Sequence, residues 1–177
     1  MKETNIYQRT IMIFPQFNNH EVIDEIREKY DPLYHLVKPH ITLVFPFQCE
    51  ISDEELSLKM DECLEKINSF PLILQGISRH RDTYGNYIFL NVKSGSQEII
   101  EIHRLLYLAL FDGQFPKSFI PHMTMGNLDS EDKMEAVYDT LKDMDICFET
   151  MVEKVSVERI GEHGESIIII EKELKRI

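Results

Sequence analysis

Long apolar runs are missing from this chain of 177 residues. The longest in the C-terminal part, Ile167–Ile170, is far too short to cross a bilayer, and the charged N-terminal segment leads into no apolar stretch of the signal-peptide kind. We therefore expect a cytoplasmic protein without a membrane partner. Because 43% of the residues are hydrophobic and no segment is of low complexity, the chain can still form an ordinary globular core.

Cysteine is also scarce. Cys49, Cys63 and Cys147 are far apart, odd in number and in no CxxC pair. This pattern argues against a disulfide framework and against a zinc knuckle. We expect reduced thiols that are buried as small hydrophobic groups.

Positive charge is in deficit, since 19 Lys and Arg face 31 Asp and Glu, for a net charge of -12. Binding to duplex nucleic acid requires clustered cations, so this balance argues against a duplex-binding protein. It does not exclude a small phosphorylated ligand in a locally neutral or positive cleft.

The hydrophobic spacing predicts strands and helices that alternate along the chain, with a tail richer in strands. No linker stands out, so we expect residues 1–177 to form a single domain of the α+β class with mainly antiparallel sheets. Strands are expected over 7–14, 40–47, 71–78, 87–92, 119–126, 146–151, 154–160 and 166–172, helices over 20–30, 52–68, 95–111 and 129–141, and a polar loop over 79–86.

A short internal repeat carries the chemistry. The sequence PHITL begins at Pro39 and PHMTM begins at Pro121, and each lies in a predicted strand that a predicted helix follows. A shuffled chain of this composition would contain the pattern Pro-His-apolar-Thr-apolar roughly 0.002 times. Two copies are therefore a strong signal of a shared function.

The spacing within each copy has a direct structural meaning. Side chains alternate between the two faces of a strand, so a histidine and the threonine two residues later point the same way. The apolar residues between and after them point to the other face and can fill a core. Each copy thus anchors itself in a hydrophobic layer while it presents an imidazole beside a hydroxyl.

Two imidazoles that converge on one cleft can act as a general base and a general acid near neutral pH. We predict His40 and His122 as the catalytic pair, facing each other across that cleft. Thr42 and Thr124 would bind the substrate by donating hydrogen bonds to non-bridging phosphoryl oxygens. The surplus of carboxylates should raise the pKa of both histidines, because negative potential favours imidazolium.

Two other interpretations of the histidines compete with this one. A lone histidine on a strand is usually structural, but two in identical motifs favour catalysis. A zinc site needs closely spaced ligands, and neither motif offers a second histidine or a carboxylate nearby, so no metal or other cofactor is expected. His35 and His80 are further candidates for the rim of the cleft. They belong to five histidines that have no matching context and are expected on the surface or on helices: His20, His35, His80, His103 and His163.

On these residues the chain resembles the two-histidine phosphoesterase superfamily, which includes 2′-5′ RNA ligase-like proteins and cyclic nucleotide phosphodiesterases. Its mark is two copies of His-x-Thr/Ser-x, and both copies here match at all four positions. The segments YDPLYHLVKPHITL and FIPHMTMGNL are similar to a small bacterial branch of phosphoesterases within it. The resemblance extends over essentially the whole chain, and the two motifs are its specific part.

The resemblance implies a bilobal fold with pseudo-two-fold symmetry, in which helices flank antiparallel sheets around a central cleft. It also implies metal-independent hydrolysis of a small phosphodiester: a 2′,3′-cyclic phosphate, a 2′-5′ linked nucleotide or an RNA end. Several relatives place an arginine just after the second motif, where this chain has Gly126 and Asn127. Neither the division of roles between the histidines nor the oligomeric state follows from it.

Two weaker candidates for the rim of the cleft are Tyr84 and Arg81, which lie in the polar loop and could bind substrate. An alternative of a different class is a non-catalytic module that binds a nucleotide or an RNA end in the same cleft. The intact histidine pair favours hydrolysis, since lysine or arginine would serve binding alone equally well. Ligation, the reverse of hydrolysis at a 2′-5′ bond, is disfavoured by the acidic surface.

Overall fold

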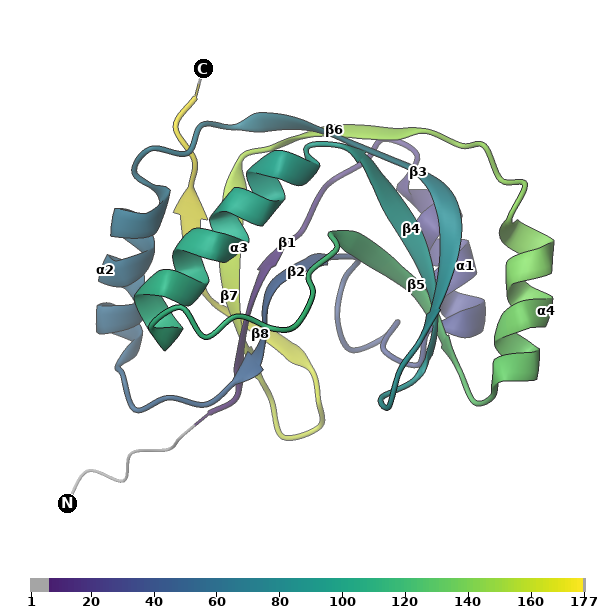
Figure 1. The fold of residues 1–177 in the computed structure, drawn as a ribbon, viewed down its shortest axis with the longest axis horizontal. Coiled ribbons are helices and arrows are strands. Elements are labelled where there is room, and N and C mark those ends of the chain that lie inside the picture. The colour runs from purple at the N-terminus through teal and green to yellow at the C-terminus, as the bar shows by residue number, and fades with distance from the viewer. Residues whose placement is uncertain (1–6, 177) are drawn as a thin grey trace.

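The computed structural model describes residues 7–176, which form two antiparallel four-stranded sheets with four helices (Figure 1). This is the predicted α+β class. The first sheet has the order β2 (Ile41–Phe47), β1 (Arg9–Ile13), β7 (Lys154–Ile160) and β8 (Ser166–Glu173). The second has the order β5 (His122–Leu128), β4 (Asn86–Ser94), β3 (Phe70–Arg81) and β6 (Phe148–Val152).

Each sheet carries two helices and forms one lobe. In the first lobe, α3 (Ser96–Phe111) packs on β2, and α2 (Asp53–Leu64) packs on α3 and β8. In the second lobe, α1 (His20–Tyr30) packs on β5, and α4 (Glu131–Leu141) packs on β3, β4 and β5. Figure 1 shows α2 and α3 on one side of the molecule and α1 and α4 on the other.

The two lobes are related by a pseudo-two-fold axis. The segment β1–α1–β2–α2 matches β4–α3–β5–α4, and the sheet orders match strand for strand. The helix within each segment crosses to the other lobe: α1 follows β1 but packs on β5, whereas α3 follows β4 but packs on β2. The edge strands β2 and β5 meet at the centre (Figure 1).

The alternation of side chains gives each sheet an outer face, which the helices cover, and an inner face opposite to it. The outer face of the first sheet supplies fully buried residues to the core, among them Ile11, Ile41 and Leu43. Ile88, Leu90, Met123 and Met125 do the same for the second sheet. The inner faces are the surfaces that can carry polar and catalytic groups.

The expected polar loop over residues 79–86 is wrong. β3 continues to Arg81 and pairs with β4 as far as Arg81 opposite Asn86, so only a tight turn separates them. The Asp82 carboxylate accepts the backbone N–H groups of Tyr84 and Gly85 in that turn. Arg79 and Arg81 pair with Ile88 and Asn86 of β4, and both also form ion pairs with α4.

The cysteines are free, but only partly buried: Cys49 and Cys63 are half-buried, and Cys147 is exposed, against expectation. The Cys147 thiol lies 3.4 Å from the carboxylate of Glu149. Among residues 7–176, no helix combines the length and the apolar character needed to span a membrane.

Candidate active site

The two copies of the repeat occupy matching places at the centre of the molecule. His40 directly precedes β2, and His122 is the first residue of β5. As the alternation requires, Ile41, Leu43, Met123 and Met125 are fully buried in the core. His40, Thr42, His122 and Thr124 are half-buried. The strands therefore present all four polar side chains away from the helices, on the inner faces.

Both imidazoles are held in the same way. The ring nitrogen Nδ1 of His40 lies 2.8 Å from the carbonyl oxygen of Lys38, and that of His122 lies 2.7 Å from the carbonyl oxygen of Ile120. A carbonyl can only accept, so each Nδ1 carries the hydrogen and donates it. This leaves each Nε2 as the atom that exchanges a proton.

The prolines of the repeat lie between each imidazole and its carbonyl partner. A proline ring fixes its own φ near −65°, which restricts the backbone between residues i−2 and i. Pro39 and Pro121 thus help to orient Lys38 and Ile120 toward the histidine that follows. The proline is part of the site because it orients the imidazole.

The pKa of His40 is lowered, chiefly because burial disfavours the imidazolium. The hydrogen bond to Lys38 and the charge of Asp31 oppose this effect, whereas the charges of Arg27 and His122 add to it. His40 and His122 therefore lie within electrostatic reach of each other.

The pKa of His122 is lowered as well, again chiefly by burial, with the charge of His80 acting in the same direction. Its ring stacks on Phe89 of β4, with centroids 3.7 Å apart and planes inclined by 25°. The Phe14 ring lies 6.0 Å from that of His40, too far for such close stacking. The two histidines thus share a tether and differ in their surroundings.

The expectation that surplus carboxylates would raise both pKa values is wrong. Net charge acts through solvent, where salt screens it over about 10 Å. Local desolvation and neighbouring cations act at contact distance and outweigh it at both histidines. The pKa values of both histidines are therefore determined by the groups around them and not by the acidic surface.

The threonines lie in equivalent registers. Thr42 is opposite Met12 of β1, and Thr124 is opposite Phe89 of β4. Each shares the inner face with the histidine two residues before it. The structure therefore places both pairs of polar groups as the spacing predicted.

The two weaker candidates lie farther out. Tyr84 is at the tip of the β3–β4 turn with 85% of its surface exposed. The Arg81 guanidinium is engaged by the carboxylate of Glu131 on α4, on the outer side of the sheet. Arg81 is therefore not a free cation for a ligand on the inner face.

Gly126 follows the second motif for a steric reason. It is buried against the end of α1, where an added Cβ would lie 2.9 Å from Cβ of Tyr30 and 3.2 Å from its carbonyl oxygen. A larger side chain at this position would have to push α1 away from β5. Within residues 7–176 no group of three or more His, Cys, Asp or Glu side chains is placed to hold a metal ion.

A groove of about 640 Å³ adjoins the His40 side of the site. Its walls include Phe14, whose ring neighbours His40, and Lys38, whose carbonyl holds it. Tyr34 and His35 line it from the loop before β2, and Ser156 and Ser166 line it from the inner face of the first sheet.

Sequence reasoning missed two neighbours of His122. Phe89, Tyr87 and His80 form a row of rings beside it, but only His80 is expected near the cleft, and for the other two the sequence offered only the alternation of residues 87–92. His103, expected on the surface or on a helix, is buried on α3 and donates from Nδ1 to the carbonyl of Leu43 on β2, 2.7 Å away. It is a structural link to the first motif strand.

A two-lobed α+β fold with paired histidine–threonine motifs on the two edge strands that meet at its centre defines the class of the two-histidine phosphoesterases. The chain belongs to the 2′-5′ RNA ligase superfamily, whose family model matches residues 14–164. A Geobacillus kaustophilus protein named "Putative phosphoesterase" is 33% identical over 148 residues, covering 81% of this chain and 83% of its own. A Bacillus licheniformis protein of the same description is 26% identical over 146 residues, covering 81% and 85%.

Solved structures agree on the fold. E. coli LigT in its apo form covers 96% of this chain and 98% of its own, with a TM-score of 0.63 and 15% identity. The complex of LigT with 3′-AMP covers 96% and 99%, with a TM-score of 0.61 and 16% identity. The bilobal architecture expected from the resemblance is thereby confirmed.

Proposed function

We propose that this protein is a metal-independent phosphoesterase that hydrolyses a small phosphodiester with His40 and His122 as general acid and base. The substrate class is a 2′,3′-cyclic phosphate, a 2′-5′ linked nucleotide or an RNA end. The observation that carries the proposal is the matched pair of Nδ1–carbonyl hydrogen bonds, which leave two Nε2 atoms for proton transfer. A module that only binds nucleotides has no need of two imidazoles with fixed tautomers.

The chemistry divides into two proton transfers. One imidazole is neutral, and its Nε2 takes a proton from a water molecule as the water oxygen bonds to phosphorus. The other is protonated and gives its Nε2 proton to the leaving ribose oxygen as the P–O bond breaks. The hydroxyls of Thr42 and Thr124 donate hydrogen bonds to the non-bridging oxygens, where negative charge concentrates in the transition state.

The family and the neighbours support this substrate class. The chain belongs to a superfamily named for 2′-5′ RNA ligation, and its relatives are described as phosphoesterases. LigT has been solved in complex with ATP and with 3′-AMP, which are small nucleotides. A nucleotide phosphodiester is the ligand that combines these observations.

The test is turnover of adenosine 2′,3′-cyclic phosphate and of a 2′-5′ linked diadenosine, followed by chromatography of the products. We expect His40→Ala and His122→Ala each to lower kcat by about 10²- to 10⁴-fold, the usual contribution of a general acid or base. Thr42→Val, which removes the hydroxyl and keeps the shape, should cost on the order of 10- to 100-fold, as one hydrogen bond to a charged group does. Thr42→Ser should retain most of the activity.

His20→Ala is the matched control, because His20 is an exposed histidine on α1 that pairs with Asp24. It should turn over at the wild-type rate. Full activity in His40→Ala would disprove the two-histidine scheme. Binding of the cyclic nucleotide without any turnover by the wild-type protein would establish the binding module instead.

A further inference from the structure

A row of four rings runs across the second sheet from the catalytic histidine. The Phe89 ring lies 3.7 Å from that of His122, 5.7 Å from that of Tyr87 and 5.8 Å from that of His80, measured between centroids. The planes of these three pairs differ by only 25°, 22° and 18°. The rings thus stand nearly parallel, and we call His80, Tyr87, Phe89 and His122 the ring row.

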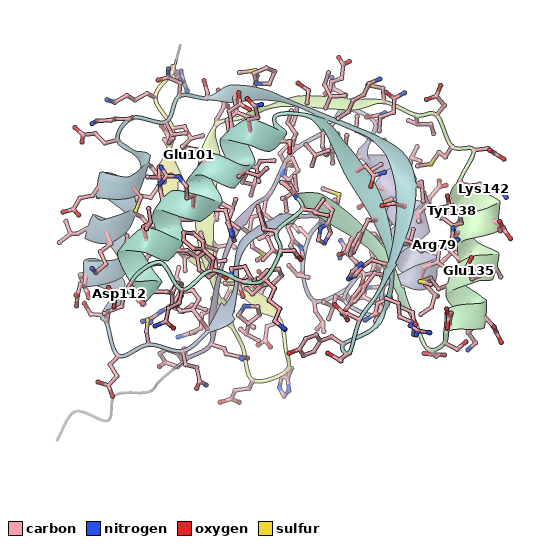
Figure 2. The ribbon with its side chains drawn as sticks, viewed as in Figure 1. Arg79, Glu101, Asp112, Glu135, Tyr138 and Lys142 are labelled. Atoms are coloured by element: carbon pink, nitrogen blue, oxygen red, sulfur yellow. The ribbon has the colours of Figure 1, made fainter. Side chains whose placement is uncertain are left out.

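The ring row lies on the inner face of the sheet. Arg79 turns outward to α4, where its guanidinium meets the Glu135 carboxylate at 2.6 Å and the Tyr138 ring at 4.2 Å (Figure 2). His80, the next residue of β3, therefore points inward. On β4 the intervening Ile88 and Leu90 are fully buried in the core, so Tyr87 and Phe89 also point inward.

Register places the ring row beside the reactive groups. Phe89 is opposite Thr124, Tyr87 is opposite His80 and Asn127, and all these strands are antiparallel. A strand rises about 3.4 Å per residue, so Tyr87 lies about 7 Å farther along β4 from the partner of His122 than Phe89 does. Tyr87 and Phe89 are half-buried, and His80 is exposed.

The first lobe has no counterpart of the ring row. The pseudo-two-fold axis matches Phe89 with Met12, since these residues face Thr124 and Thr42 respectively. By the same pairing Tyr87 matches Thr10, and His80 matches Glu158. Met12, Thr10 and Glu158 are buried, with 1%, 3% and 7% of their surfaces exposed. At the positions that match Phe89, Tyr87 and His80, the first lobe therefore carries buried side chains without rings.

We infer that the ring row binds the nucleobase of the substrate, so that the nucleoside extends over the second lobe from a phosphoryl group held at the two histidines. This inference rests on the proposed function. Aromatic side chains bind bases by stacking, and every base offers a π face, so the ring row accepts purines and pyrimidines. Purines bind more tightly because their ring system is larger. The 2′,3′-cyclic nucleotides are then better substrates than cyclic phosphates that lack a base.

The experiment compares adenosine 2′,3′-cyclic phosphate with glycerol 1,2-cyclic phosphate, which presents the same five-membered ring without a base. Tyr87→Leu removes the outer aromatic ring and keeps an apolar side chain, whereas Tyr87→Phe keeps the ring. We expect the preference of the wild-type protein, expressed as the ratio of the two kcat/KM values, to fall about 5- to 100-fold in Tyr87→Leu. Most of the loss should appear in KM, and Tyr87→Phe should restore the ratio.

A second measurement does not depend on turnover. Calorimetric binding of 3′-AMP and of inorganic phosphate should show a weaker Kd for 3′-AMP in Tyr87→Leu by the same factor, with no matching change for phosphate. Hydrolysis of both cyclic phosphates with equal efficiency by the wild-type protein would overturn the ring row and leave the proposed function standing. No hydrolysis of either substrate, with Tyr87-dependent binding of 3′-AMP, would overturn the proposed function alone. If neither hydrolysis nor Tyr87-dependent binding of 3′-AMP is found, both the proposed function and the role of the ring row are overturned. An equal loss of kcat/KM on both substrates in Tyr87→Leu would show that Tyr87 has only a structural role.

Discussion

His40 and His122 are chemically alike and have unlike neighbours. Arg27 and Asp31 act on the first, and Phe89 and His80 act on the second. A general base and a general acid must differ in protonation at one pH, so these differences are the means by which one pair of imidazoles can divide two roles. Burial lowers both pKa values, which moves the whole titration to the acidic side.

The pH dependence follows from these directions. Free imidazole titrates near ~6.5, and both histidines lose their protons below that value in the free protein. Below the lower step the base is protonated, and above the upper step the acid has lost its proton. We therefore expect a bell-shaped profile of kcat/KM for a cyclic phosphodiester, with its maximum on the acidic side of ~6.5. Bound phosphate favours imidazolium, so the profile of kcat should lie at higher pH.

Initial rates measured at intervals of about half a pH unit, from about pH 4.5 to about pH 8.5, give this profile. Circular dichroism at each pH checks that the protein stays folded. A rate that rises to a plateau at high pH would contradict the assignment, because it would show that no protonated group takes part.

At the residue scale the repeat predicted which side chains lie on which face of the motif strands. The alternation of His40-Ile41-Thr42-Leu43 put the core residues and the polar residues on the correct faces. The tether from Nδ1 to the carbonyl two residues earlier was beyond its reach, because the alternation of side chains does not give the backbone angles between Lys38 and His40. The stacking of Phe89 on His122 depends on the pairing register of β4 with β5, which no local pattern contains.

At the element scale, the loop that leads from α1 to His40 is fixed by a buried ion pair. Arg27 donates from Nε to the Asp31 carboxylate at 2.8 Å and from Nη2 to the Val37 carbonyl at 2.9 Å. The other carboxylate oxygen of Asp31 accepts the backbone N–H of Leu33. Only 1% and 4% of the Arg27 and Asp31 side chains are exposed. The end of α1 thereby holds the segment before β2 in place.

Arg27→Met should be strongly destabilising, because it leaves the Asp31 carboxylate buried without its cation. Removal of one partner of a buried pair costs about 3–5 kcal/mol. Arg104→Met is the matched control, since Arg104 pairs with Glu101 on the exposed face of α3, where each side chain is nearly half exposed. It should change the free energy of unfolding by at most about 1 kcal/mol.

Urea unfolding of both variants measures this difference. Equal stability of the two variants would show that the buried pair does not hold the loop. A folded Arg27→Met protein should also have a reduced kcat, because His40 follows the loosened segment.

The extent of the elements was predictable where local signals were strong. Ser52 and Ser130 accept the backbone N–H groups of Glu55 and Lys133 at the starts of α2 and α4, close to the predicted helix starts. The length of β3 was not predictable, because Arg79 and Arg81 are polar and no local pattern contains their pairing with β4 or their ion pairs with α4. In the sequence, polar residues of a strand resemble those of a loop when the helix that they contact lies far along the chain.

At the scale of the whole molecule, no group of three or more His, Cys, Asp or Glu side chains within residues 7–176 is placed to bind a metal ion. We expect hydrolysis of adenosine 2′,3′-cyclic phosphate to survive exhaustive treatment with EDTA, since the proposed acid and base are side chains and need no metal-bound water. Rates before and after chelation, with and without added Mg²⁺, Mn²⁺ or Zn²⁺, decide this. Loss with EDTA and recovery with one of these ions would require a metallohydrolase mechanism.

The crossing of α1 and α3 between the lobes has a consequence for how the molecule folds. The N-terminal half of the chain holds β1, β2 and α1, whereas β7 and β8 of the same sheet, and the helix α3 that covers β2, lie in the C-terminal half. The C-terminal half in turn receives α1 as the cover of its motif strand β5. Either half alone would expose the apolar side of its motif strand to water, and the crossing helix would have no sheet to cover. The lobes must therefore acquire and lose their cores together, as one cooperative unit. Two peptides cut between β2 and β4 would regain order only by complementing each other.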